Sequence, residues 1–353
     1  MSRRVASPGA AGLPTWLRRL LPRPRAARED RAPPRDSRED ALLRWNVKVL
    51  ASEIARRRYA EGLAGPEAAL PAAPLRIGLT SRVCRQADIE HDWLRHWCGR
   101  LRMVPSYHRK VWEDCFVLQA LWEAGMLAPG RRALGFAVGR EWLPAFFAGL
   151  GIEVLATDLD PADARAREWI ETGQHAPASD KLFQPHLVGE EAFARLVRHR
   201  AVDMNAIPED LKRGRFDFLW SVCSLEHLGS LERGEDFVVE AMRCLRPGGV
   251  AVHTTEFNLD AEGGTIERGP TVLYQRRHLD RLAARLAATG HRMLRLDSHP
   301  GTGVLDRLVD LPPFPHEAAS PFGVVEAPHL RLALDGYPVT SVGIVVRARR
   351  PAP

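Results

Sequence analysis

The 353-residue chain has few cysteines and no long apolar segment. Its five cysteines are an odd number, lie far apart and include no Cys-x-x-Cys pair. This pattern argues against a disulfide framework and a cysteine zinc site, and it favours a reducing compartment. No apolar run approaches the roughly 20 residues that a membrane span needs, and the N-terminus lacks the apolar core of a signal peptide. We therefore expect a cytoplasmic protein without a membrane span.

Basic residues outnumber acidic ones, but the excess is local. The net charge is +6, and residues 1–40 hold ten Arg against five Asp or Glu. Because the rest of the chain is almost neutral, it has no basic patch that demands a nucleic acid, and we do not expect a nucleic-acid partner. The segment 1–37 is rich in Pro, Arg and Ala, which predicts a disordered tail. Binding to nucleic acid or anionic lipid is the alternative role of such a tail.

The organisation of the chain changes near residue 129. Apolar residues at helical spacing predict a helix and then a linker over 38–75, and tryptophan-rich helices over 76–128 that would form a cap. From 129 to 348, short apolar runs alternate with helical patterns, which indicates an α/β fold. The expected runs are Arg132–Phe136, Glu153–Thr157, Ala201–Met204, Phe216–Val222 and Val250–Thr255.

We therefore predict a seven-stranded, mostly parallel, Rossmann-like sheet with helices on both faces. Its last strand, at about Val339–Val346, is expected to be antiparallel.

Glycines follow the first of these strands. Gly135 and Gly139 stand between a strand and a helix, where glycine lets the backbone approach a ligand closely. The second strand ends at Asp158, 19 residues beyond Gly139. An acid at this place can accept hydrogen bonds from ribose hydroxyls. Capping of the segment after Pro161 is its alternative role.

Two later features complete the pattern. The third expected strand ends at Asp203-Met204, and Leu245-Arg246-Pro247-Gly248-Gly249 leads into the fifth. Over about 130–258 the sequence resembles the class I S-adenosylmethionine-dependent methyltransferases. The resemblance implies S-adenosylmethionine as cofactor. It places the methionine part at Gly135, Ala137 and Gly139, the ribose at Asp158 and Leu159, and the adenine at Asp203 and Met204, with Ser221 also in the cofactor site.

The turn departs from the family pattern, which reads acid-x-Gly-x-Gly-x-Gly. Here Ala133 takes the place of the acid and Ala137 that of the middle glycine. Glu141, just inside the next helix, is a possible substitute for the acid, although a helix-start acid is the plainer interpretation.

Acceptor chemistry is expected beyond the fourth and fifth strands. His227 or Glu226 is the predicted base, since an imidazole titrates near neutral pH; bracing of the next helix is the alternative. Predicted substrate contacts are Tyr107, Arg109, Trp112, Glu256 and Asn258, and the segment from Trp169 to His175 is a further candidate.

A metal is a separate question. Small-RNA 2′-O-methyltransferases, which this region resembles, use Glu-x-x-Glu-His, whereas this chain has Cys223-x-x-Glu226-His227. Because a cysteine replaces the first acid, we predict no metal.

The predicted function is S-adenosylmethionine-dependent O-methylation of a hydroxyl on a sugar, glycan or small metabolite. The alternatives are a non-catalytic, methyltransferase-like interaction module and a nucleic-acid methyltransferase.

Overall fold

The computed structural model describes residues 35–63, 70–312, 314 and 327–349. Within this part of the chain, one sheet has five parallel strands at its centre. In spatial order these are β4 (Val197–Ala201), β3 (Glu153–Asp158), β2 (Arg132–Phe136), β5 (Phe216–Val222) and β6 (Leu245–Asn258). The long strand β10 (Tyr337–Arg347) follows, antiparallel to β6. The expected mostly parallel sheet with an antiparallel last strand is confirmed.

Short strands extend the sheet beyond the seven that were expected. β1 (Ser81–Val83) pairs with β10, and β8 (Leu296–Asp297) pairs with β1. β7 (Arg292–Met293) and β9 (Leu332–Leu334) also pair with β10. β1 belongs to a segment expected to be helical, and strands of two or three residues are too short to give a pattern of their own.

Both faces of the central strands are buried. Ala133, Phe218 and Trp220 pack into one apolar core, whereas Leu134 and Leu219 pack into the other. This alternation follows from the two-residue period of a strand. A parallel sheet needs cover on both faces, and the apolar runs of β2 and β5 reflect that demand.

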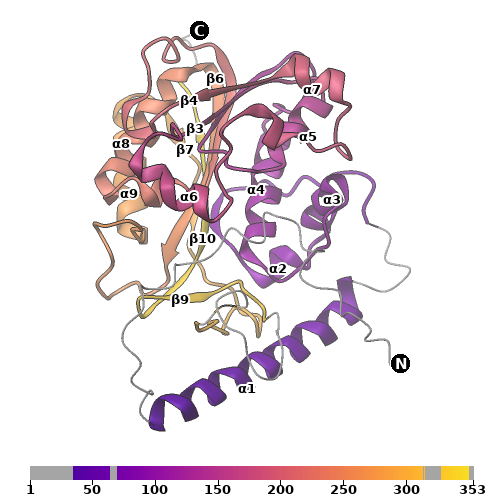
Figure 1. Cartoon of the computed structure of the whole chain (residues 1–353), viewed down its shortest axis with the longest axis vertical. Coiled ribbons are helices and arrows are strands. Elements are labelled where there is room, and N and C mark those ends of the chain that lie inside the picture. The colour runs from indigo at the N-terminus through magenta and orange to yellow at the C-terminus, as the bar shows by residue number, and fades with distance from the viewer. Residues whose placement is uncertain (1–34, 64–69, 313, 315–326, 350–353) are drawn as a thin grey trace, which may run out of the picture.

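Helices cover the two faces (Figure 1). On one side lie α3 (Asp92–Leu101), α4 (Arg109–Glu123), α5 (Leu143–Gly149) and α7 (Glu190–Leu196), and on the other α8 (Leu231–Ala241) and α9 (Arg276–Ala288). The short helices are α2 (Gln86–Ile89), α6 (Arg167–Glu171), η3 (Ala164–Ala166), η4 (Ser179–Leu182), η5 (Met204–Ala206), η6 (Leu225–His227) and η7 (Met242–Cys244).

The N-terminal helix α1 (Arg35–Arg58) runs along one end of the molecule and continues into the π-helical turn η2 (Tyr59–Leu63) (Figure 1). The predicted tail lies outside the described residues as far as residue 34, and its last three residues belong to α1. None of the described helices is long and apolar enough to span a membrane.

The third expected strand is displaced. β4 ends at Ala201, where that strand was predicted to begin, and Met204 opens η5. β4 is an edge strand, in which Arg198 is exposed and His199 and Arg200 are only partly covered. Its sequence therefore lacks the apolar run that marks the buried strands.

Candidate active site

A cavity of about 630 Å³ lies beyond the carboxyl ends of β2, β3 and β5. Open α/β sheets bind ligands at this edge. The loops after these strands form much of the wall, together with α6 and the start of α8. The wall contains seven of the predicted site residues, namely Ala137, Gly139, Asp158, Leu159, Asp203, Met204 and His227.

The turn after β2 has the left-handed backbone conformation that favours glycine, although one of its positions is an alanine. Ala137 has φ of +48° and Gly139 has φ of +52°. The left-handed conformation costs a non-glycine residue about 1–2 kcal/mol, so Ala137 is held there by its surroundings. A Cβ on Gly139 would lie 2.7 Å from the carbonyl oxygen of Gln174. Gly139 is therefore required by its close contact with the backbone at Gln174, and the approach of this turn to a ligand stays a prediction.

Gly135 has a different role from the predicted one. A Cβ there would lie 2.4 Å from the indole ring of Trp220. Gly135 is absent from the cavity wall. Its glycine is explained by the packing of Trp220 against the strand, rather than by contact with a ligand.

Asp158 ends β3 with its carboxylate held by backbone donors. Leu159 N–H donates to Oδ1 at 2.9 Å, and Ala176 N–H donates to Oδ2 at 3.2 Å. Burial raises the pKa of Asp158 above its ordinary value. A carboxylate oxygen can accept two hydrogen bonds, so each oxygen retains capacity for a ligand hydroxyl.

Glu141 also lies on the cavity wall and is buried. Its Oε2 accepts a hydrogen bond of 2.9 Å from Nε1 of Trp220. The role of Glu141 as a substitute for the acid missing at Ala133 stays a prediction.

Asp203 and Met204 lie in the loop after β4. Oδ1 of Asp203 accepts from the N–H of Asn205 at 2.8 Å, which caps η5. Its Oδ2 accepts from the guanidinium of Arg165 at 2.8 Å. Although the strand was misplaced by a few residues, both side chains reach the cavity.

His227 lies on the cavity wall and Glu226 behind it. The carbonyl oxygen of Pro270 lies 2.9 Å from Nδ1 of His227, so this nitrogen carries the proton and Nε2 has a free lone pair. The ring of Trp169 packs edge-on against His227, with centroids 4.6 Å apart. Glu226 is buried, which raises its pKa, and its Oε2 accepts from the hydroxyl of Thr255 at 2.9 Å.

A buried charged cluster lies beside the cavity and joins α4 to the sheet. Nη2 of Arg109 lies 2.6 Å from Oε1 of Glu256, and its Nη1 lies 3.4 Å from Glu113. Lys110 also contacts Glu113, at 3.2 Å. Burial by itself would raise the pKa of Glu113, but the charges of Lys110 and Arg109 outweigh it and lower that pKa.

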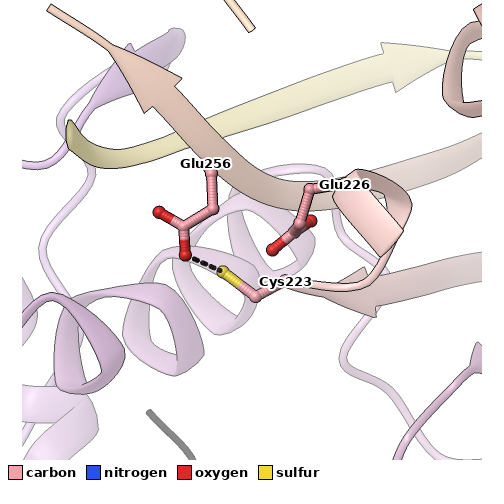
Figure 2. A group of neighbouring side chains, drawn as sticks. All are labelled: Cys223, Glu226 and Glu256. Atoms are coloured by element: carbon pink, nitrogen blue, oxygen red, sulfur yellow. Dashed lines mark hydrogen bonds between the residues drawn. The ribbon is translucent and has the colours of Figure 1, made fainter. Parts of the chain in front are cut away.

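Cys223 connects this cluster with the cavity. It lies on the cavity wall with φ of +42°, and its thiol donates to Oε1 of Glu113 at 3.2 Å. Figure 2 shows Cys223, Glu226 and Glu256 converging, with a longer contact of 3.9 Å from the thiol to Glu256. Burial raises the pKa of this thiol well above its ordinary value.

The same three side chains bring metal-ligating atoms within 4.8 Å of one another. Arg109 and Lys110 already bring positive charge to this cluster, and the thiol of Cys223 is engaged as a donor. We therefore assign the arrangement to the charged cluster, and the absence of a metal stays a prediction.

The remaining predicted residues are not on the cavity wall. The hydroxyl of Tyr107 donates to Glu90 at 2.9 Å, and Nε1 of Trp112 donates to Asp88 at 2.9 Å. Trp112 stacks on Phe116 in the core. Because α4 is buried on all sides, its predicted substrate face packs against the protein instead.

Arg109 and Glu256 pair with each other, as described above. Ser221 bonds His253 at 2.8 Å between strands, and the amide of Asn258 donates to the carbonyl of Gly264 at 3.1 Å. These two predicted contacts therefore brace the sheet and the loop after β6.

Sequence reasoning missed three arginines on the wall, Arg165, Arg167 and Arg233. Arg165 and Arg167 lie in the connection after Asp158, and Arg233 lies in the first turn of α8. Their short distance in sequence from Asp158 and His227 is the signal that could have identified them. From the predicted segment Trp169–His175, the side chains of Trp169, Gln174 and His175 line the cavity.

Comparison with known proteins agrees with this geometry. Residues 134–253 match the model of a methyltransferase domain family. No curated protein matches the sequence significantly.

Solved structures with a similar fold share little sequence with the chain. The cyclase SpnF is 20% identical, with a TM-score of 0.38 over 52% of this chain and 61% of that one. A SAM-dependent methyltransferase from Aquifex aeolicus is 14% identical, with a TM-score of 0.36 over 65% of this chain and 88% of that one. Phosphoethanolamine N-methyltransferase 2 from Haemonchus contortus is 17% identical, with a TM-score of 0.34 over 50% and 37%. The chain thus spans less than two thirds of two of these proteins.

The sheet order and the cavity at the carboxyl edge define an open α/β fold with its cavity where such folds bind ligands. Over residues 134–253 the chain is similar to a methyltransferase domain.

Proposed function

We propose that the chain transfers a methyl group from S-adenosylmethionine to a hydroxyl of a sugar, glycan or small metabolite, with His227 as the base. The observation that carries the proposal is that Asp158, Asp203 and His227 line one cavity. The carboxylates of Asp158 and Asp203 suit the hydroxyls and the amine of adenosine, and the imidazole of His227 suits an acceptor hydroxyl.

The residues present fit the cofactor. Asp158 is held in place by two backbone N–H groups, and it keeps acceptor capacity for ribose hydroxyls. Ala137 and Gly139 keep the left-handed turn that exposes the backbone. When bound, S-adenosylmethionine supplies a methyl carbon that is already electrophilic on its sulfonium.

The protein's contribution is then alignment, exclusion of water and removal of one proton. S-adenosylmethionine held at Asp158 and Gly139 would supply the methyl group to the acceptor oxygen. The hydroxyl proton passes to Nε2 of His227, whose lone pair is free because Nδ1 binds Pro270. Glu226, whose Oε1 lies 3.9 Å from that Nε2, is placed to stabilise the resulting imidazolium.

Calorimetric titration with S-adenosylhomocysteine tests the cofactor site. We expect micromolar binding by the wild type and a loss of about ten- to 100-fold for Asp158→Ala, since hydrogen bonds to a charged group contribute about 1.5–3 kcal/mol. Asp160→Ala is the matched control, because this neighbouring acid is exposed. NAD should not bind. Failure of the folded wild type to bind S-adenosylhomocysteine would refute the proposal and favour a non-catalytic module.

An acceptor screen with labelled S-adenosylmethionine follows. With a hydroxyl acceptor, His227→Ala should lower kcat by about 10²–10⁴-fold and leave the affinity for S-adenosylhomocysteine unchanged. Equal activity of the wild type and His227→Ala would show that His227 is not the base.

A further inference from the structure

The arginines on the cavity wall differ in whether an acidic residue neutralises their charge. The acidic residues on the wall are Glu141, Asp158 and Asp203, and each holds a hydrogen bond from the protein. The arginines are Arg165, Arg167 and Arg233. Only Arg165 is neutralised, through contacts with Asp163 at 2.6 Å and Asp203 at 2.8 Å.

Arg167 and Arg233 are exposed, and neither forms an ion pair with any residue that the structure describes. They reach the cavity from different elements, since Arg167 opens α6 and Arg233 lies in the first turn of α8. Two guanidinium groups without a carboxylate partner among the described residues therefore line this cavity.

Each arginine lies close in sequence to a residue that surrounds the proposed base. Arg167 stands in α6 two residues before Trp169, whose ring packs against His227. The guanidinium of Arg233 lies over Gly229, with Nη1 only 3.3 Å from the position of a Cβ there. Gly229 follows His227 by two residues and also lines the cavity. Both arginines are thus close in sequence to residues around His227.

Guanidinium groups bind carboxylates and phosphates through paired hydrogen bonds, and arginine keeps its charge at any working pH. We propose that Arg167 and Arg233 bind an oxyanion of the acceptor, so that the substrate is a small hydroxyl compound carrying a phosphate or carboxylate group. This inference rests on the proposed methyltransferase function and names the acceptor class that the same cavity would select.

A competing role is binding of the cofactor's own methionine carboxylate. 5′-Methylthioadenosine lacks that carboxylate, so it separates the two roles. If the arginines serve the acceptor, Arg167→Gln and Arg233→Gln should bind S-adenosylhomocysteine and 5′-methylthioadenosine as the wild type does. Selective loss of S-adenosylhomocysteine binding in either variant would overturn the inference.

The direct test is calorimetry on the full chain saturated with S-adenosylhomocysteine. Glucose 6-phosphate, glucuronate and glucose are titrated in turn, as probes with a phosphate, a carboxylate and no charge. We expect at least one charged probe to bind at least tenfold more tightly than glucose. Binding of only one of them identifies the group. Each arginine variant should weaken it at least tenfold.

Arg268→Gln is the matched control, because it removes the same charge beside Gly269 from a side chain that is 79% exposed and absent from the wall. It should change binding by less than twofold. Equal binding of all three probes, binding of none, or equal loss in Arg268→Gln would refute the inference. Binding of S-adenosylhomocysteine in the same cell would still support the proposed function, so the two failures are distinguishable.

Discussion

Replacing Arg109 by methionine tests the buried charged cluster most directly. Arg109 is 3% exposed and contacts Glu256 at 2.6 Å, Ser341 at 3.0 Å and Glu113 at 3.4 Å. Methionine fills similar space but leaves the carboxylate of Glu256 buried without its cation. Breaking a buried pair in this way costs about 3–5 kcal/mol. We expect Arg109→Met to lower the free energy of unfolding by that amount, measured by urea denaturation.

A second substitution shows that charge is the cause. Arg109→Met combined with Glu256→Gln removes both charges, so the double variant should lose about 1 kcal/mol less than the sum of the singles. Arg276→Met is the control, because its pair with Asp280 is exposed on both sides, and exposed pairs contribute about 0–1 kcal/mol.

A different result would refute this reasoning. If Arg109→Met left the unfolding transition unchanged but raised KM for the acceptor, Arg109 would be the substrate contact that the sequence alone predicted. Additive losses in the double variant would show that Glu256 is not the partner that matters.

Two further changes test the site. Gly139→Ala would put a Cβ 2.7 Å from the carbonyl oxygen of Gln174 at φ of +52°, so it should lower the affinity for S-adenosylhomocysteine at least about tenfold. Gly189→Ala is the control and should leave this affinity unchanged, because its Cβ would meet no atom within 4 Å. Equal affinities of the two variants would exclude the turn from cofactor binding. Glu226→Gln tests a pH dependence, because burial raises the pKa of Glu226 above 4.5. The protonated form is therefore favoured in the folded state, and the stability that this proton contributes is present below pH 4.5 and lost as pH rises through the folded pKa. Since glutamine mimics the protonated form, its advantage in free energy of unfolding should grow as pH rises through this window, and a constant difference in urea denaturation across it would contradict the assignment.

Much of the predicted cofactor site could be predicted from the sequence. Strands β2 and β5 begin and end where their apolar runs do, because burial on both faces leaves a continuous signal. Asp158, Asp203 and Met204 follow strand ends, and parallel strands bring such positions to one edge. The place of Asp158 on the cavity wall was therefore predictable from order and spacing, whereas Asp203 and Met204 were predicted from the resemblance to class I methyltransferases. The edge strand β4 was misplaced because its partly exposed residues carry no apolar run.

The predicted substrate contacts of the segment 107–112 lie away from the cavity wall. Tyr107, Arg109 and Trp112 stand on a helix with aromatic and basic residues, a pattern that fits either a substrate surface or a core helix. The structure shows a core helix, because acids from other parts of the chain satisfy the polar groups of these residues. Asp88 accepts from Trp112, Glu90 from Tyr107, and Glu256 pairs with Arg109.

The sequence by itself determined the parallel sheet, the turn after its first strand and the acids at the strand ends, since periodicity and spacing are local properties. Only the tertiary structure decided which polar side chains face the cavity and which face one another. Arg109 illustrates the reason: its partners Glu256 and Ser341 come from β6 and β10, far along the chain. Whether a buried charge is satisfied depends on such distant neighbours, and no local pattern records them.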